Sequence, residues 1–411
     1  MIERERANQR ASKQRTAAIF LMAVIISGVL LAGLYYARRS GPDPTIYGND
    51  FSVYYFAAAE MVEGRDPYQN SIGEWVPYLY TPLLAELLMP LALLPIPVAA
   101  YLWFLISAAA VALAMCMLAR SFPRENLENQ PLPVGSLEMF AAAGAVLIAA
   151  RFVLDTFYMG QVNTIVMMLA VAHVYLYSKN RKTAAGFMLA LAATMKVTPI
   201  VLIFYHLARL RFKYAAACVG LIALVAAMSF AGLGRDARQG AQTFFNRTIA
   251  NGQGFDLKYS GNQSLRGFEL RLYQESEDSN RVPRGPITII ISLVLLAAAW
   301  LASRRGATEL EAAAPFFCLA VILSPLSWKD HYVIIIPAVT AVIWRFLSAR
   351  TRSRRVIFGL IIVGSFLLFN VTSWRIIGLF GAEWADAHSL IFTGGILIFL
   401  AVLMNPRVGC S

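Results

Sequence analysis

Charged residues are scarce in this chain. They make up 15% of its 411 residues, whereas hydrophobic residues make up 58%. A typical soluble domain carries roughly a quarter charged residues and roughly half apolar ones. The composition therefore excludes an ordinary water-soluble protein and predicts an integral membrane protein, with the lipid bilayer as its main partner.

Cysteines, linkers and repeats are also few or missing. The chain has four cysteines; Cys116, Cys218 and Cys318 fall in apolar segments and Cys410 in the tail, without metal-ligand spacing. We therefore expect neither a disulfide nor a zinc site. The sequence contains no fixed-period repeat, Pro/Ser-rich linker or low-complexity tract, which predicts a single domain over residues 1–411.

Positive charge, by contrast, is in excess. The net charge is +12, but the Lys and Arg residues of the chain gather in short clusters between apolar segments. This arrangement is typical of cytoplasmic anchors and excludes a nucleic-acid-binding surface. The clusters lie at 4–15, 179–182, 209–213, 304–305 and 345–355.

The clusters orient a chain of about thirteen apolar segments, several of them shorter than the ~20 residues of a full span. We expect a cytoplasmic tail over 1–16, an uncleaved anchor over 17–37, and extracytoplasmic loops over 38–81 and 234–285. The loops alternate without conflict only if the proline-bounded segment 83–94 is re-entrant or peripheral. The sequence thus predicts an all-α polytopic membrane protein with about twelve transmembrane helices, in the cell membrane.

The first extracytoplasmic loop offers a candidate catalytic base. Asp50 precedes an aromatic cluster that includes Tyr54 and Tyr55. A carboxylate partly desolvated near a membrane surface can have a raised pKa and accept a proton from a hydroxyl. An Asp in front of an apolar run is also a common helix N-cap, and this structural interpretation stays open.

Polar residues at the other predicted outer loops are further candidates. Asp155, Gln161 and Asn163 crowd the mouth of an apolar helix, where they would bind a sugar or each other, and Asp155 could simply pair with Arg151 at i, i+4 spacing. Lys196, between two short apolar stretches, is either a phosphate-binding cation or a residue that snorkels to the interface.

Two later segments complete the set. The long loop contains Asn262, Gln263 and Arg266 in the run GNQSLRG, which could order on a ligand. The turn SPLSWKDHY brings Trp328 and His331 between two helices, with Asp330 positioned to set the pKa of the histidine. Such a turn is also compatible with ordinary membrane-interface chemistry.

Taken together, these segments resemble glycosyltransferase family 87, polytopic enzymes of the GT-C superfamily that include mannosyltransferases extending phosphatidylinositol mannosides. The resemblance covers most of the chain. The motifs that carry it are Asp50 followed by Tyr54, GRDPY at 64–68, YTPLLAELLMPLALLP at 80–95, GQVN at 160–163, KVTP at 196–199, NQS at 262–264 and SPLSW at 324–328.

The resemblance implies a GT-C-type helical bundle that transfers a hexose, with mannose the first expectation, from a polyprenyl-phosphate donor. The acceptor would be a lipid or glycan hydroxyl on the extracytoplasmic face, and the anomeric carbon would be inverted. Asp50 would act as base and His331 would orient the acceptor or assist the carboxylate. Lys196 and Arg266 would hold the donor phosphate.

The remaining candidates would contact the substrates; they are Tyr54, Tyr55, Asp155, Gln161, Asn163, Asn262, Gln263 and Trp328. The first loop has no D-x-D pair, so we expect no metal or other cofactor. Two other functions stay open. A transporter or flippase would place its polar features near the bilayer midplane in two related halves, and a noncatalytic scaffold of envelope glycan assembly would keep the fold alone.

Overall fold

The protein is a bundle of helices. The computed structural model describes residues 28, 31–33, 50–68, 77–122, 136–250, 257–273 and 286–404, and within these ranges all regular elements are helical. The all-α prediction is confirmed for this part of the chain. Most of the predicted anchor over 17–37 and the basic cluster over 4–15 lie outside the described residues.

The N-terminal half of the bundle begins with a short helix and contains two of the five longest apolar helices described, α5 and α11. Its elements are α3 (Asp50–Val62), α4 (Pro82–Ala92), α5 (Ile96–Ala119), α6 (Ser136–Ile148), α7 (Ala150–Met159), α8 (Asn163–Ser178), α9 (Lys182–Met195), the 3₁₀ turn η1 (Thr198–Val201), α10 (Leu202–Ala208), α11 (Phe212–Ala231) and the 3₁₀ turn η2 (Gly234–Asp236).

The C-terminal half contributes the remaining helices and turns. They are α12 (Ala237–Phe244), the π-helical turn η3 (Phe245–Ala250), α13 (Leu265–Tyr273), α14 (Pro286–Arg305), α15 (Glu309–Ile322), the 3₁₀ segment η5 (Lys329–Ile335), α16 (Ile336–Leu347), α17 (Arg352–Phe366), the π-helical turn η6 (Leu367–Val371), α18 (Trp374–Ala387) and α19 (Leu390–Leu403).

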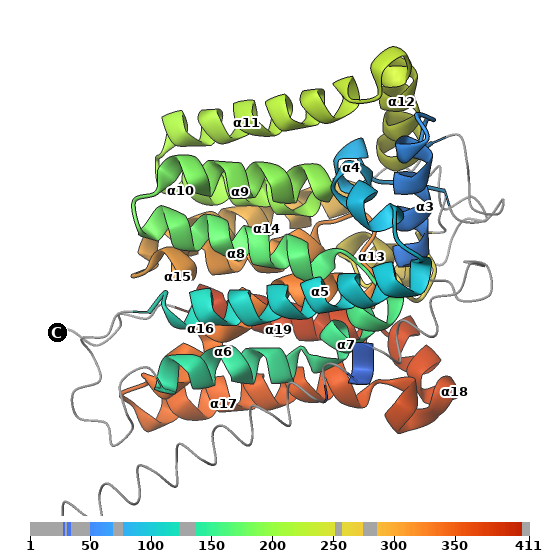
Figure 1. The fold of residues 1–411 in the computed structure, drawn as a ribbon. Helices are drawn as coiled ribbons and strands as arrows, with labels where there is room; N and C mark the ends of the chain where they lie inside the picture. The colour runs from blue at the N-terminus through green and yellow to red at the C-terminus, as the bar shows by residue number, and fades with distance from the viewer. Residues whose placement is uncertain are drawn as a thin grey trace, which may run out of the picture.

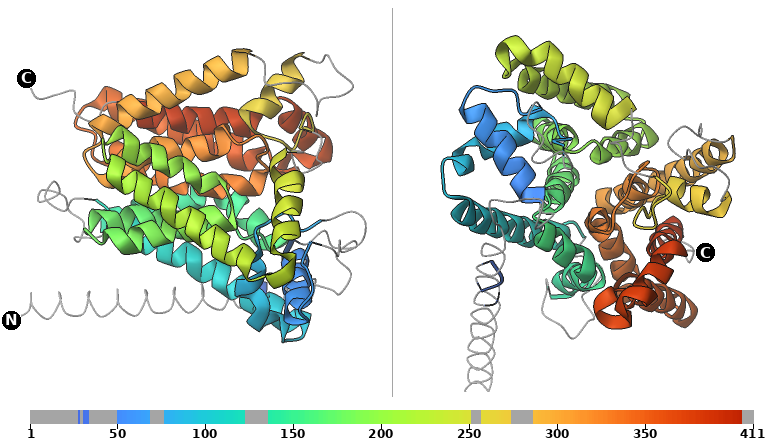
Figure 2. Two further views of the ribbon diagram at one scale, coloured as in Figure 1. Left: turned by 90° about the horizontal axis from the view of Figure 1, so that it is seen from above. Right: turned by 90° about the vertical axis from the view of Figure 1, so that its right-hand side faces the viewer.

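The long helices run side by side, and the short helices α3, α4, α7, α12, α13 and α18 gather at one end of the bundle (Figure 1). Seen along the bundle, the chain forms two groups, one from α3 to α11 and one from α14 to α19 (Figure 2). Within the first group, α8 packs against α5 and α9; α16 reaches across to α6. One apolar core spans both groups, and a second lies among α3, α4, α5 and α8.

Five described helices are long and apolar enough to cross a membrane, or up to seven if each of two bent pairs counts as one span. The number of about twelve crossings stays a prediction. The helix α4, in the segment predicted as re-entrant, has only 11 residues and a proline at position 90 within it. Such a helix is too short to span a ~30 Å hydrocarbon core on its own.

Local breaks in the helices build the end of the bundle at which the short helices meet. The segment 151–161, which the sequence predicts as an outer loop, is largely helical: α7 continues from α6 with a bend of 62°. It ends at Gly160, whose φ of 65° is easily adopted by glycine. The two long predicted loops likewise carry short helices, α3 in the first and α12 and α13 in the second.

Candidate functional site

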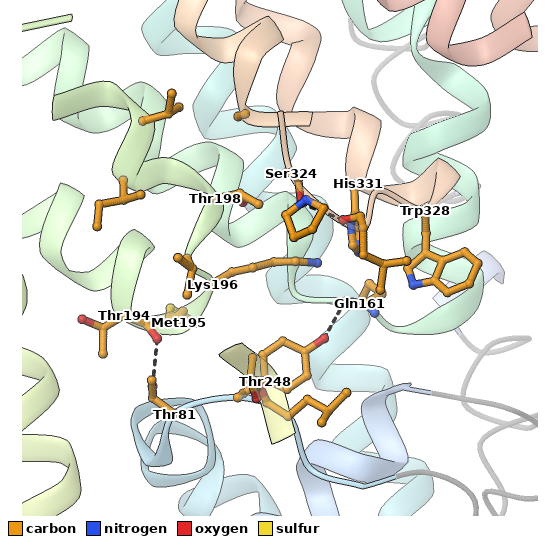
Figure 3. Close-up of a pocket in the computed structure, with 18 of the residues that line it drawn as sticks. Thr81, Gln161, Thr194, Met195, Lys196, Thr198, Thr248, Ser324, Trp328 and His331 are labelled. Atoms are coloured by element: carbon orange, nitrogen blue, oxygen red, sulfur yellow. Dashed lines mark hydrogen bonds between the residues drawn. The ribbon is translucent and has the colours of Figure 1, made fainter. Parts of the chain in front are cut away.

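A cavity of about 360 Å³ opens among the short helices (Figure 3). Its walls come from the start of α3, the strip 77–81 before α4, the start of α8, the end of α9 with η1, the α12–η3 junction, and the segment that follows α15. The lining contains both polar and apolar side chains. The polar lining residues include Asp50, Tyr80, Gln161, Lys196, Trp328 and His331; the apolar ones include Val197, Ile200, Val201, Leu319 and Leu323.

Asp50 is the first residue of α3 and is only partly exposed. Desolvation by the surrounding protein raises the pKa of its carboxyl from 3.8 to about 7, and the nearby charge of Asp330 contributes in the same direction. Lys196 and a hydrogen bond with the Gln161 side chain act in the opposite direction. A carboxyl with a pKa of about 7 can accept a proton near neutral pH.

The Gln161 side chain is oriented by two tyrosines. Its Oε1 accepts hydrogen bonds from the hydroxyls of Tyr54 at 2.8 Å and Tyr80 at 3.3 Å. With the carbonyl oxygen occupied in this way, the amide NH₂ is the group left to face Asp50. Tyr54 thus acts through Gln161, from a fully buried position.

Lys196 supplies the cation of the cavity. It follows α9 in an extended conformation, and its side chain crosses the cavity with the amine toward Gln161 and His331 (Figure 3). Desolvation lowers the pKa of the amine from 10.5 to about 8, while the carboxylates of Asp330 and Asp50 oppose this shift. The amine is therefore largely protonated at neutral pH and can hold an anion.

A chain of hydrogen bonds connects Lys196 to a buried carboxylate. Lys196 Nζ donates to Asn163 Oδ1 at 2.6 Å, and Asn163 Nδ2 donates to Asp330 Oδ2 at 2.6 Å. His331 Nε2 lies 3.9 Å from the same carboxylate oxygen. His331 Nδ1 is buried without a hydrogen-bond partner among the described residues. Asn163 thus orients Lys196, and His331 lines the cavity beside this chain of hydrogen bonds.

Several predicted site residues lie elsewhere. Arg266 is buried in α13 and pairs with Glu269 at 2.8 Å, away from the residues that line the cavity. Asp155 lies 3.7 Å from Arg151 as an i, i+4 pair. Tyr55 donates its hydroxyl to the carbonyl of Leu94 at 2.8 Å. The structure gives each of these residues an internal partner.

Asn262 and Gln263 are also used structurally. Asn262 Nδ2 donates to the carbonyls of Leu257 and Pro325, and its Oδ1 accepts from backbone amides. Gln263 Nε2 donates to the carbonyls of Ser260 and Asp386. Both side chains are fully buried, so their polar groups hold the long loop to the bundle and are not offered to a ligand.

Two residues of the site are not predicted as site residues by the sequence. The sequence gives Asp330 only an influence on the pKa of His331, and it gives Tyr80 only a place in a motif. The usable signal for Asp330 is its position next to His331 at a helix end. In the described part of the chain, no three His, Cys, Asp or Glu side chains form a metal-binding group.

Comparisons with known proteins point in one direction. Residues 78–328, more than half of the chain, match the sequence profile of glycosyltransferase family 87. The chain is 26% identical over 356 residues to a polyprenol-phosphate-mannose-dependent alpha-(1-2)-phosphatidylinositol mannoside mannosyltransferase of Mycobacterium tuberculosis, covering 82% of this chain and 79% of the relative.

A second relative, also from Mycobacterium tuberculosis, is described as a polyprenol-phosphate-mannose-dependent alpha-(1-2)-phosphatidylinositol pentamannoside mannosyltransferase. It is 27% identical over 334 residues, covering 79% of this chain and 72% of the relative. The matched profile includes Gln161, Asn163 and Lys196, whereas Asp50 and His331 lie outside it. Their place in the site rests on the geometry of the cavity.

Proposed function

Because the chain belongs to glycosyltransferase family 87 and is a membrane glycosyltransferase, we propose that it transfers mannose from a polyprenyl-phosphate donor to a hydroxyl of a lipid or glycan acceptor. We further propose that the transfer occurs on the extracytoplasmic face and inverts the anomeric carbon. The names of the relatives support the donor, and the chemistry of the cavity supports the mechanism.

The observation that carries the mechanism is that Asp50 and Lys196 line the same cavity. One is a carboxyl that can gain a proton near neutral pH, and the other is a cation that can hold a phosphate. A displacement at a sugar phosphate needs both of these groups, a base for the attacking hydroxyl and a cation for the leaving group.

In the proposed step, the acceptor oxygen attacks the anomeric carbon of mannose while its proton passes to the Asp50 carboxylate. The bond between that carbon and the phosphate oxygen breaks, and its electron pair leaves with polyprenyl phosphate. The phosphate thereby gains negative charge, which the ammonium of Lys196 stabilises. A single displacement of this kind inverts the configuration.

The apolar residues of the cavity lining suit the lipid part of the donor. Val197 and Ile200 are exposed at the end of α9 and in η1, next to Lys196. A polyprenyl chain that leaves the phosphate at Lys196 would meet this apolar surface at once. We therefore propose that the donor enters with its phosphate at Lys196 and its lipid along η1.

The charge distribution supports the extracytoplasmic placement. The basic clusters at 179–182, 209–213, 304–305 and 350–355 join helices at the end of the bundle opposite the cavity (Figure 1). Cytoplasmic loops carry the excess of Lys and Arg in membrane proteins, so the cavity would face outward. His331, which lines the cavity, would then orient the acceptor. We propose no metal, since the two roles are filled by Asp50 and Lys196.

The alternative functions are less well supported. A transporter would place its polar groups near the bilayer midplane, where broken helices meet. Here the cavity lies among the short helices at one end of the bundle. A noncatalytic scaffold has no need of a base and a cation in one cavity.

A transfer assay tests the proposal. Proteoliposomes of the purified protein receive radiolabelled polyprenyl-phosphate mannose and, in parallel, the glucose analogue, together with membrane lipid extract. We expect label to move from the mannose donor to a lipid with the wild type and not with Asp50→Asn. Equal transfer by the two proteins would remove Asp50 as base, and transfer by the wild type from the glucose donor alone would contradict mannose as the sugar.

A further inference from the structure

α18 lies at the end of the bundle where the short helices gather (Figure 1), and it exposes many large apolar side chains. Gly378 has a non-helical conformation, with φ 73° and ψ 172°, and kinks α18. Phe380, after the kink, is 85% exposed, and further large apolar side chains on both sides of the kink are also exposed; they are Trp374, Ile376, Ile377, Leu379 and Trp384. α18 does not continue α19 as a straight span, because the two helices meet at an angle of 60°.

The other side of α18 is fixed to the protein. Ala382, Ala385 and Asp386 are buried. The Asp386 carboxylate accepts a hydrogen bond from Lys329 Nζ, and its backbone carbonyl accepts one from Gln263 Nε2 at 2.9 Å. α18 is therefore docked through the part that follows Gly378, and it leaves apolar side chains on both sides of the kink uncovered.

The candidate span that precedes α18 in the chain also exposes apolar side chains. Arg352–Val371 is a candidate membrane span, and Leu360, Val363 and Leu367 on it are exposed. The chain then turns and enters α18 at Trp374. Apolar surface on a membrane span is covered by lipid tails, so its continuation at the end of the span meets the level of the lipid headgroups.

The residue composition of α18 is typical of helices at the level of the lipid headgroups. Trp374 and Trp384 are exposed, and the Arg375 guanidinium lies 5.3 Å from the centre of the Trp374 ring. Tryptophans and basic side chains are enriched at the boundary between lipid and water. An amphipathic helix with such residues lies in the plane of the interface, with its apolar face buried by roughly 5–10 Å.

We propose that α18 is an interfacial helix whose exposed apolar face lies in the headgroup region of the bilayer and holds the cavity end of the bundle at the membrane surface. The link to the site is direct. Lys329, which holds Asp386 of α18, stands between Trp328 on one side and Asp330 and His331 on the other. This inference concerns membrane contact and is independent of the transfer reaction.

The test measures the depth of α18 in reconstituted protein. Cys116 and Cys410 are replaced by serine, whereas Cys218 and Cys318 are buried and stay. A fluorescent label on Phe380→Cys is compared in phosphatidylcholine vesicles with labels on Leu360→Cys, on the exposed face of the α17 span, and on Glu63→Cys, in the exposed turn after α3. Lipids with bromine near the headgroup or near the bilayer centre act as quenchers.

We expect the label at 380 to be quenched more strongly by the shallow bromines than by the deep ones. The label at 360 should be quenched strongly by lipid bromines at its depth, and the label at 63 hardly at all. A label at 380 that behaves like the one at 63 would overturn the proposal, because α18 would then face water. The proposal would also be overturned if the 380 label were protected from both quenchers and unlabelled Phe380→Cys chains formed disulfide cross-links. A second copy of the chain would then cover the helix.

A second variant checks the apolar face itself. With the label moved to Trp384→Cys, adding Phe380→Glu places a charge on the exposed face without removing a buried contact, as Phe380 is mostly exposed. We expect quenching of the 384 label by shallow bromines to fall toward the level of the Glu63 control. Unchanged quenching would show that the apolar face does not hold α18 at the interface.

Discussion

The polar groups that line the cavity and those at the opposite end of the bundle differ in their partners. At the end opposite the cavity, Arg211 and Glu309 form a bidentate pair, with nitrogen to oxygen distances of 2.8 and 2.6 Å. Nearby, His173 Nε2 and His206 Nε2 lie 2.8 Å apart. At the cavity end, Asp50 and Lys196 face an open space and influence each other only at longer range.

The difference separates structural from functional polar groups. A charge in a membrane protein is costly unless it is paired or faces water, so each charged group needs a physical reason. Pairs that satisfy each other, such as Arg211 with Glu309, hold helix ends together. Charges that share a cavity without a direct pair are available for a ligand. The comparison predicts that changes to the unpaired charges of the cavity reduce transfer, whereas changes to the paired charges reduce stability.

The largest effect on transfer should come from neutralising Asp50, and Glu309 at the opposite end of the bundle serves as the control. Asp50→Asn should lower the transfer rate about 10²–10⁴-fold, the usual contribution of a general base. Glu309→Gln should leave the rate of the folded protein nearly unchanged. Initial rates in proteoliposomes, normalised to folded protein, check this. A similar loss in both variants would contradict the distinction between the two ends.

The next effect concerns the cations. Lys196→Met should lower the transfer rate about 10²–10³-fold, because the charge on the departing phosphate loses its partner, and Lys196→Arg should recover part of it. Lys213→Met removes the same charge at the opposite end and should change little. The measurement is kcat/KM for the polyprenyl-phosphate donor. A Lys196→Met protein with wild-type kcat/KM would exclude Lys196 from phosphate binding.

A smaller effect is expected at Asn163, which orients Lys196 without lining the cavity itself. Asn163→Ala should lower transfer by about 10- to 100-fold, because one hydrogen bond to a charged group contributes about 1.5–3 kcal/mol. Its loss should appear mainly in kcat if the lysine acts in the transition state. A rise in donor KM with unchanged kcat would indicate that Lys196 binds the donor equally in the ground state.

Arg345 should show the smallest effect on transfer and the largest effect on stability. Its Nη1 donates to the carbonyls of Ala401, Val402 and Met404, and its Nε lies 3.5 Å from Glu311. Arg345→Met should destabilise the protein by about 3–5 kcal/mol, since it removes the cation from a buried carboxylate and leaves it only backbone hydrogen bonds. Thermal unfolding in detergent measures this, and an unchanged midpoint would contradict the structural role.

The sequence predicted the outline of the site because its residues occur at predicted helix ends on one side of the membrane. Asp50, Gln161, Asn163, Lys196, Trp328 and His331 come together at one end of the bundle, with Asn163 contacting Lys196. The charge of the loops and the hydropathy of the segments between them indicate which helix ends share one side of the membrane. The number of membrane crossings depends on how short and bent helices pair, which periodicity does not encode.

The sequence did not separate ligand-facing from structural polar residues. Arg266, Asn262 and Gln263 look as promising as Lys196 in the sequence, yet their polar groups are satisfied within the protein. Conversely, Asp330 belongs to the site through Asn163, which is 167 positions away. Such long-range partners decide whether a polar group is free, and local patterns do not contain them.

The dependence of transfer on pH tests the pairing of Asp50 as base with Lys196 as cation most directly. Asp50 must be deprotonated to accept the proton, so kcat/KM should rise with pH through about 7; Lys196 must be protonated to hold phosphate, so it should fall again above about 8. We expect a bell-shaped profile with a narrow maximum between these values, and Lys196→Arg should keep the acidic limb and lose the basic one. A wild-type profile that is flat from pH 5 to 9, under conditions in which the protein stays folded, would contradict these roles.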